Sequence, residues 1–244
     1  MTTPPEIQIN AVTLIRRGFI ALIGLELWMG LMDFTFAYMR LSSQRVVQRL
    51  NNLAREDGVG TWFASSQALL VGLVLFGLAS LSWRPERREA LGWGLLASFF
   101  TYVSMDDALS FHERVGGALR RATYADGAEW FPSYSWQLMF GPLFGAMGLF
   151  MVWFLARRLA PNLRPWLAIA LSCFVLAVGL DFVEGLDEAF ASIADVVGVS
   201  EYTVSHGSKV TEELLEMAGT TSFLAMFSLQ LVASLGGRRI VLAP

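Results

Sequence analysis

Residues 100–114 read FTYVSMDDALSFHER, and this stretch decides how the rest of the chain is interpreted. An apolar run leads directly into four ionisable side chains: Asp106, Asp107, His112 and Glu113. Charged groups at the edge of so apolar a segment are costly unless they are paired, protonated or used for binding. The second histidine of the chain, His206, lies in another acid-rich stretch, EYTVSHGSKVTEELLEM. We therefore predict that the two stretches meet in one polar site.

The composition indicates an integral membrane protein. Of the 244 residues, 55% are hydrophobic and 16% are charged, whereas about 25% of residues are charged in a typical soluble domain. The mean hydropathy is +0.51. A net charge of -3 without a lysine-rich tract gives no reason to expect nucleic acid as a partner. The single cysteine, Cys173, lies in an apolar run, so an intramolecular disulfide and a cysteine-based metal site are excluded.

Six apolar windows are long enough, at about 20 residues each, to cross the hydrocarbon core as helices. They cover residues 18–39, 62–83, 90–111, 135–155, 165–187 and 211–235. We predict an all-α transmembrane bundle of six helices that forms a single domain over residues 1–244. Arg16 and Arg17 are loosely similar to a twin-arginine export signal, but no small-residue cleavage site follows, so we expect the first span to be retained.

An even number of spans places both termini on one side of the membrane, together with the short loops at residues 84–89 and 156–164. Of the eighteen Lys and Arg side chains, eight lie on the opposite side. Ten lie on the side of the termini: Arg16, Arg17, Arg84, Arg87, Arg88, Arg157, Arg158, Arg164, Arg238 and Arg239. Because cytoplasmic loops are enriched in basic residues, we expect this side to be cytoplasmic, in a bacterial cytoplasmic membrane. On the opposite side, residues 41–54 place apolar side chains at helical spacing. This segment is either an amphipathic helix on the membrane surface or a solvated connecting helix.

Polar and acidic side chains gather at the span ends on the side opposite the termini. The acids are Asp33 in the first span, Asp106 and Asp107 in the third, Asp181, Glu184, Asp187 and Glu188 at the end of the fifth, and Glu212, Glu213 and Glu216 in the sixth. Ser65, Ser66, Gln67 and Gln137 join them from the second and fourth spans. Glu26, near the middle of the first span, is the exception. His112 leaves the face of Asp106 in a regular helix, so it reaches the site only if the helix bends or unwinds.

Two histidines with an excess of carboxylates suit zinc, iron or manganese, and also match the ligands of a dinuclear site in a helical bundle. The expected metal ligands are Asp106, His112, Glu113, Asp181, Glu184, His206, Glu212 and Glu216. Asp107 and Glu213 are expected to move protons as catalytic residues. The local signatures Glu-x-x-His and His-Glu-x-x-His are absent. Two simpler readings stay open: interfacial histidines that touch water, and first-turn acids favoured by the helix dipole.

Three functions fit these observations. The first is an intramembrane metal-dependent enzyme with its site near the outer face, a hydrolase of a lipid-like or small substrate with zinc or an oxidase with iron. The second is a proton-coupled or metal cation transporter, in which Glu26 and Asp33, seven residues apart, form steps of a path. The third is a non-catalytic membrane subunit whose acids pair with a partner's basic residues. Membrane lipids are the partner that all three share.

Overall fold

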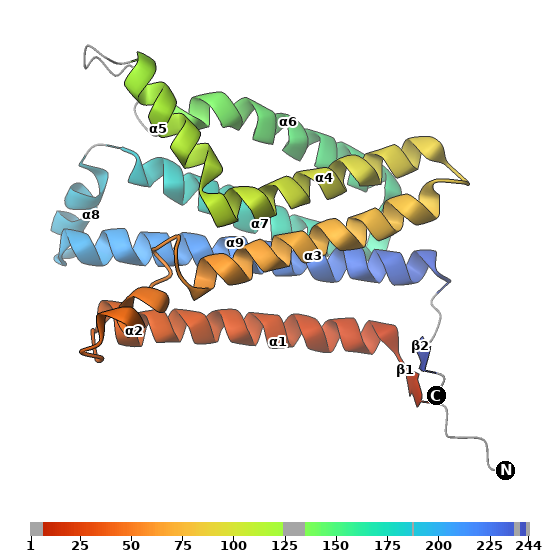
Figure 1. Ribbon diagram of the computed structural model, residues 1–244, viewed down its shortest axis with the longest axis horizontal. Helices are drawn as coiled ribbons and strands as arrows, with labels where there is room; N and C mark the ends of the chain where they lie inside the picture. The colour runs from red at the N-terminus through yellow and green to blue at the C-terminus, as the bar shows by residue number, and fades with distance from the viewer. Residues whose placement is uncertain (1–6, 124–134, 187, 237–239, 243–244) are drawn as a thin grey trace.

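The computed structural model describes residues 7–123, 135–186, 188–236 and 240–242, and it is mostly helical (Figure 1). The long helices of this part are α1 (Ala11–Met32), extended by the π-helix η1 (Asp33–Tyr38), α3 (Val59–Ser82), α4 (Arg87–Leu109), α6 (Ser135–Arg158), α7 (Arg164–Glu184) and α9 (Glu201–Ser234). The shorter elements are α2 (Arg45–Leu50), α5 (Phe111–Thr123), the 3-10 helix η2 (Pro161–Leu163), α8 (Ala189–Val197), and the strands β1 (Ile7–Ile9) and β2 (Ile240–Leu242).

Each of the six predicted windows coincides with one of the long helices. Five helical segments of the described chain are long and apolar enough to cross a membrane: Ala11–Tyr38, Val59–Ser82, Phe140–Arg158, Pro161–Glu184 and Glu201–Ser234. Helix α4 is not among them, although it has 23 residues. Charged residues at both of its ends, from Arg87 to Glu89 and at Asp106 and Asp107, interrupt its apolar stretch. A membrane protein is thus supported, and the sixth crossing stays a prediction.

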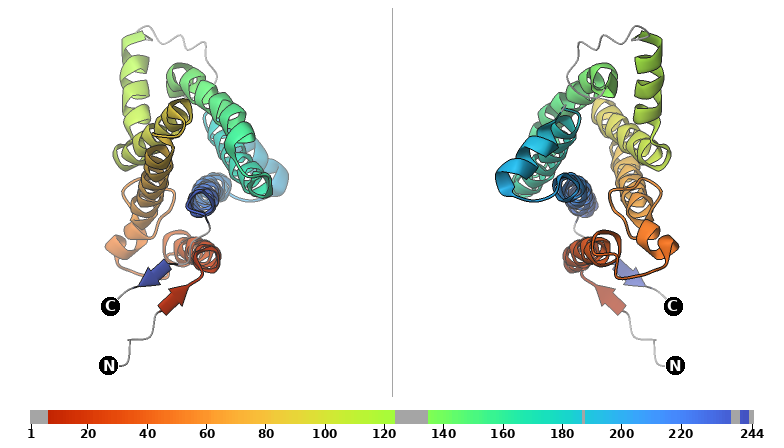
Figure 2. Two further views of the ribbon diagram at one scale, coloured as in Figure 1. Left: turned by 90° about the vertical axis from the view of Figure 1, so that its right-hand side faces the viewer. Right: turned by 90° about the vertical axis from the view of Figure 1, so that its left-hand side faces the viewer.

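Helix α9 is the element around which the others pack. It contacts α1, α3, α7 and α8, and its 34 residues span about 51 Å at the usual rise of ~1.5 Å per residue. Figure 2, which looks along the bundle, shows α3 and α4 on one side and α6 and α7 on the other, with α9 between them and close to α1. Its apolar window is half buried, a larger share than in the other four candidate spans. Side chains on α9 therefore face neighbours on most sides.

An aromatic core fills the half of the bundle nearer the chain termini. Trp93, Phe100, Phe154, Phe223 and Phe227 are almost fully buried. The ring centroids of Trp93 and Phe154 lie 4.9 Å apart, and those of Phe100 and Phe223 lie 5.2 Å apart, both edge to face. Such aromatic pairs contribute about 0.5–1.5 kcal/mol each beyond their area burial. This half of the bundle is therefore a packed apolar block.

A single residue, Ser110, separates α4 from α5. Its φ of 48° and ψ of 44° place it in the left-handed region, where a non-glycine residue is uncommon. The Ser110 hydroxyl donates to a carboxylate oxygen of Glu56 in the loop before α3. Figure 1 shows α5 leaving the direction of α4 at this point. The helix bend that His112 needs is thus present.

The loop between α1 and α3 is held by charge pairs and by one buried leucine. The predicted helix at residues 41–54 is shorter than expected, since α2 covers only Arg45–Leu50. Hydrogen bonds from Arg55 and Arg49 hold the pKa of Asp57 well below its usual range. Leu53 is buried, at 4% exposed, and packs against Phe63 and Met29. The helix therefore ends at Leu50, and the chain turns so that Leu53, the next apolar residue of the predicted helix, packs into the bundle.

The two ends of the described chain lie beside one another. Strand β1 pairs antiparallel with β2, with Ile7 opposite Leu242 and Ile9 opposite Ile240. Figure 1 shows this ribbon at one end of the bundle, and the junction of α4 and α5 lies toward the other. On which side of a membrane the ribbon lies is still a prediction.

Candidate functional site

His112 is oriented by a buried aspartate. Its Nδ1 lies 2.6 Å from Oδ2 of Asp106, and its backbone N–H donates to Oδ1 of the same carboxylate at 2.9 Å. The Tyr102 hydroxyl also donates to Oδ1, at 3.4 Å, and the Trp136 ring lies edge-on at 4.6 Å from the imidazole. The left-handed Ser110 makes this return contact possible. A carboxylate on one ring nitrogen fixes the orientation of an imidazole, as in metal sites and in acid–base catalysis.

Six acids on three helices lie within electrostatic reach of neighbours in the same set, around His112. With His112 and Lys209 we name them the acidic cluster: Asp106 and Asp107 on α4, Asp181 on α7, and Glu212, Glu213 and Glu216 on α9. Glu216 lies within electrostatic reach of Lys209, Asp181, His112 and Asp106. Glu213 is within reach of Asp107, and Glu212 within reach of Asp181. The structure therefore brings together acids from the third, fifth and sixth predicted spans.

Two side chains in or beside the acidic cluster form one hydrogen bond each and leave a second polar atom without a partner in the described chain. The Lys209 ammonium donates to Oε1 of Glu212 at 3.0 Å, and the Gln137 amide donates to Oδ2 of Asp181 at 2.9 Å. In the described part of the chain, Oε2 of Glu212 and Oε1 of Gln137 are buried and have no hydrogen-bond partner. Buried polar atoms nearly always have a partner, so a water, a proton donor or a cation is needed there.

His206 belongs to a second, separate group. Its Nε2 lies 2.8 Å from Oδ2 of Asp33 in η1, and Oδ1 of Asp33 accepts the backbone N–H of Leu53 at 2.9 Å. The rings of Tyr38 and Tyr202 lie 5.6 Å and 5.5 Å from the imidazole. The single polar site that we expected for both histidines is thus divided, because His206 pairs with the end of the first span and His112 with the third.

A third group lies deeper in the bundle and joins α1, α3 and α9. The carboxyl Oε1 of Glu26 accepts the Thr221 hydroxyl at 2.6 Å and the Gln67 amide at 2.9 Å, and the same amide donates to Thr221 at 2.5 Å. None of the three side chains is more than 2% exposed. We name Glu26, Gln67 and Thr221 the deep triad. Thr221 was not anticipated, since a threonine in an apolar helix carries no signal of its own.

The described residues do not form a preassembled site for the predicted metal ion. Among the residues that the structure describes, no three or more His, Cys, Asp and Glu side chains are arranged to hold a metal ion. The side chain of Glu113 lies outside the described part, and Glu184 is within electrostatic reach of Lys209. The donor atoms are still those that divalent cations use: carboxylate and amide oxygens with one imidazole.

The chain belongs to a protein family whose description is "Domain of unknown function (DUF8692)", since the model of that family matches residues 19–231. This segment contains all the residues of the acidic cluster and of the deep triad. Comparison with curated proteins and with solved structures gives no match.

Proposed function

Since membership of this family brings no activity with it, we propose from the geometry that the acidic cluster binds a divalent cation for an intramembrane reaction on a lipid-like or small substrate. The observation that carries the proposal is that Oε2 of Glu212 and Oε1 of Gln137 are buried without a hydrogen-bond partner in the described chain, within electrostatic reach of further carboxyl groups of the cluster. In a low-dielectric environment such carboxylates cannot all remain ionised without protons or cations. A bound cation would relieve that repulsion.

The free oxygen atoms indicate which side chains would hold the ion. Oε2 of Glu212 and Oε1 of Gln137 have no partner in the described chain, and Glu212 is only 5% exposed. Asp181 is the common neighbour of both residues. An ion that keeps several of its own waters needs few protein ligands, which suits a site without three preassembled ones. Zinc, iron, manganese and magnesium are the candidates, and zinc or iron would favour a site that His112 joins.

The aromatic core favours a reaction at the acidic cluster over passage through the bundle. In the described chain, the fully buried polar or charged side chains lie at the level of the deep triad or toward the acidic cluster. Beyond the triad, α9 continues with Phe223 and Phe227 in the packed apolar block. A charged species that enters from the acidic side therefore meets no polar continuation, so binding and local chemistry fit better than passage.

The protein's own groups would handle protons in such a reaction. His112, held by Asp106, would accept a proton at one ring nitrogen, and Asp107 and Glu213 would exchange protons with the cluster. A bound divalent cation would supply activated water for hydrolysis.

Proton-coupled cation transport is the second candidate. One observation favours it: titratable side chains recur along α9 at His206, Lys209, Glu213 and Glu216, and Glu26 lies beyond them. Intervals of three to four residues correspond to about 4.5–6 Å along a helix, a spacing that intervening waters can bridge. A relay of this kind would require the aromatic core to open.

We also propose six crossings, with both ends of the chain in the cytoplasm of a bacterial cell. The pairing of β1 with β2 supports an even number of passes, which the five apolar helices reach only if α4 also crosses. The arginine-rich short loops support the cytoplasmic assignment. Reporter fusions after residue 86 and after residue 160 should both report cytoplasm; an outside signal at either would overturn this topology.

Metal analysis of the detergent-purified protein tests the proposed function. After incubation with Zn2+, Mn2+ or Fe2+ and removal of the excess, the wild type should retain about one ion per chain. The variant Glu212→Gln/Glu216→Gln should retain at least tenfold less at equal free metal. Glu201→Gln, a change at an exposed acid on the same helix, is the matched control and should bind like the wild type.

Other outcomes separate the alternatives. A folded wild type that retains no ion overturns the cation-binding proposal and leaves a proton path or the non-catalytic subunit. If the ion is bound, a wild-type-specific flux of cation into liposomes would favour the transporter over the enzyme. Hydrolysis of added lipid esters or amides, lost in the double variant, would support the enzyme.

A further inference from the structure

We propose that the groove between α4 and α6, at the end of the bundle opposite to the acidic cluster, binds an anionic phospholipid. An acyl chain would lie against the aromatic wall of α6, and the phosphate would contact Arg88 and Arg157. The site is separate from the acidic cluster and goes beyond the proposed function.

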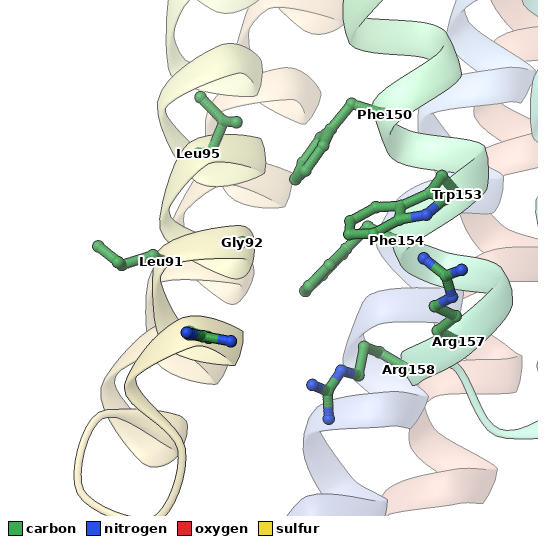
Figure 3. A pocket seen from close by; sticks show the side chains of 9 residues that line it. Leu91, Gly92, Leu95, Phe150, Trp153, Phe154, Arg157 and Arg158 are labelled. Carbon is green, nitrogen blue, oxygen red and sulfur yellow. The ribbon is translucent and has the colours of Figure 1, made fainter.

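The groove is apolar and open to the outside of the bundle. It encloses about 460 Å3, within the range of about 300–1,000 Å3 that small-molecule sites usually occupy. Figure 3 shows Phe150, Trp153 and Phe154 extending from α6 toward α4, which carries Leu91 and Leu95. Leu91 is 59% exposed and Trp153 is 54% exposed. Since α6 is apolar enough to cross a membrane and α4 is proposed to cross beside it, side chains so exposed are expected to contact lipid.

The mouth of the groove carries more positive charge than the protein neutralises. Arg158 is paired with Glu86 and Glu89. Arg88 and Arg157 are exposed, and within the described residues they have no carboxylate partner. The Arg157 guanidinium lies over the Trp153 ring, 4.5 Å from its centroid, which holds it beside the apolar wall. Two arginines that lack a carboxylate partner are therefore available to an anion.

The joint arrangement selects an amphiphile. Guanidinium groups bind phosphate oxygens through paired hydrogen bonds, and basic pockets between membrane helices bind anionic lipid head groups. Arg88 also lies in the first turn of α4, beside Glu89, whose carboxylate is engaged by Arg158. An apolar groove that ends at such a mouth matches one acyl chain joined to one phosphate. An acidic segment of a partner protein would use the charges but leave the apolar groove unfilled.

Native mass spectrometry with lipids of matched acyl chains tests the site. The wild type should retain one phosphatidylglycerol in preference to phosphatidylcholine. Arg88→Gln/Arg157→Gln should weaken phosphatidylglycerol retention about tenfold, the effect expected for losing about 1.4 kcal/mol. Arg16→Gln/Arg17→Gln makes the same change of charge on α1 at the same end of the bundle, and should leave retention unchanged. Melting curves without added lipid establish that both variants fold.

Three results would overturn the proposal. They are equal retention of the two lipids by the wild type, equal retention of phosphatidylglycerol by the two double variants, and competition by glycerol phosphate as effective as that by the lipid. The last result would point to a free phosphate compound as the ligand. Cation retention by the acidic cluster should be the same in all these variants, so this test and that of the proposed function fail independently.

Discussion

Two adjacent threonines on α9 provide a matched test of the deep triad. Thr221 donates to Oε1 of Glu26 and accepts from the amide of Gln67, whereas Thr220 donates to the carbonyl of Glu216 in its own helix. Both side chains are buried, at 0% and 6% exposed. A change to valine at either position alters shape, volume and helix propensity equally. The difference between the two variants therefore isolates the hydrogen bonds to the triad.

The structure sets the expected size of that difference. A hydrogen bond to a charged group contributes about 1.5–3 kcal/mol and one between neutral groups about 0.5–1.5 kcal/mol. Because the Gln67 amide keeps its contact with Glu26 in the variant, we expect Thr221→Val to cost about 2–3 kcal/mol. Thr220→Val should cost about 0.5 kcal/mol or less, since bonds from a threonine to its own helix stabilise little.

Thermal unfolding in one detergent, at one scan rate, measures the effect. A loss of 1 kcal/mol lowers Tm by about 2–4 °C in a chain of this size, so Thr221→Val should melt about 4–12 °C below the wild type. Thr220→Val should melt within about 2 °C of it. A double-mutant cycle with Glu26→Gln should give a coupling of about 1–2 kcal/mol. Equal Tm values for the two threonine variants, or additive effects in the cycle, would refute the triad.

Three further predictions concern stability. Asp33→Ala should lower the free energy of unfolding by about 3–5 kcal/mol, because it leaves the Leu53 N–H and the His206 Nε2 without their carboxylate partner. Asp33→Asn should recover part of that loss in the same melting assay. Gly92→Ala should cost about 1–3 kcal/mol, since its Cβ would clash with the Phe154 ring. Gly94→Ala meets nothing within 4 Å and should be neutral or stabilising, so similar Tm values for the two variants would contradict this packing. Ser110→Val should cost about 1–3 kcal/mol because a β-branched residue is strained at φ 48°, and a wild-type Tm would contradict the bend.

The arrangement of long helices follows directly from the sequence. Apolar windows of sufficient length, separated by arginine and proline clusters, admit little else in a membrane. The one-sided gathering of acids follows as well, since Asp106, Asp181 and Glu216 lie at span ends that alternate in direction. Helical spacing indicates that His112 joins Asp106 only if the helix bends or unwinds, and the left-handed Ser110 provides that bend.

The choice of partners did not follow from the sequence. His206 and Asp33 are 173 residues apart, and nothing local indicates that η1 would point this aspartate at α9. Several hydroxyls in these helices donate to the preceding turn, as those of Thr220 and Ser222 do. The different role of Thr221 therefore becomes visible only once α1 and α3 are packed against α9. Span ends and depths are set by local composition, whereas pairings depend on the rotation of each helix about its axis.

The most direct test of the central claim is an experimental structure of the protein with Mn2+, which is located by its anomalous scattering. A single anomalous peak beside Oε2 of Glu212, within coordination distance of a carboxylate of Asp181 or Glu216, is the predicted result. A well-ordered acidic cluster without such a peak at saturating Mn2+, with Glu212 hydrogen-bonded only to water or to protein groups, would contradict it.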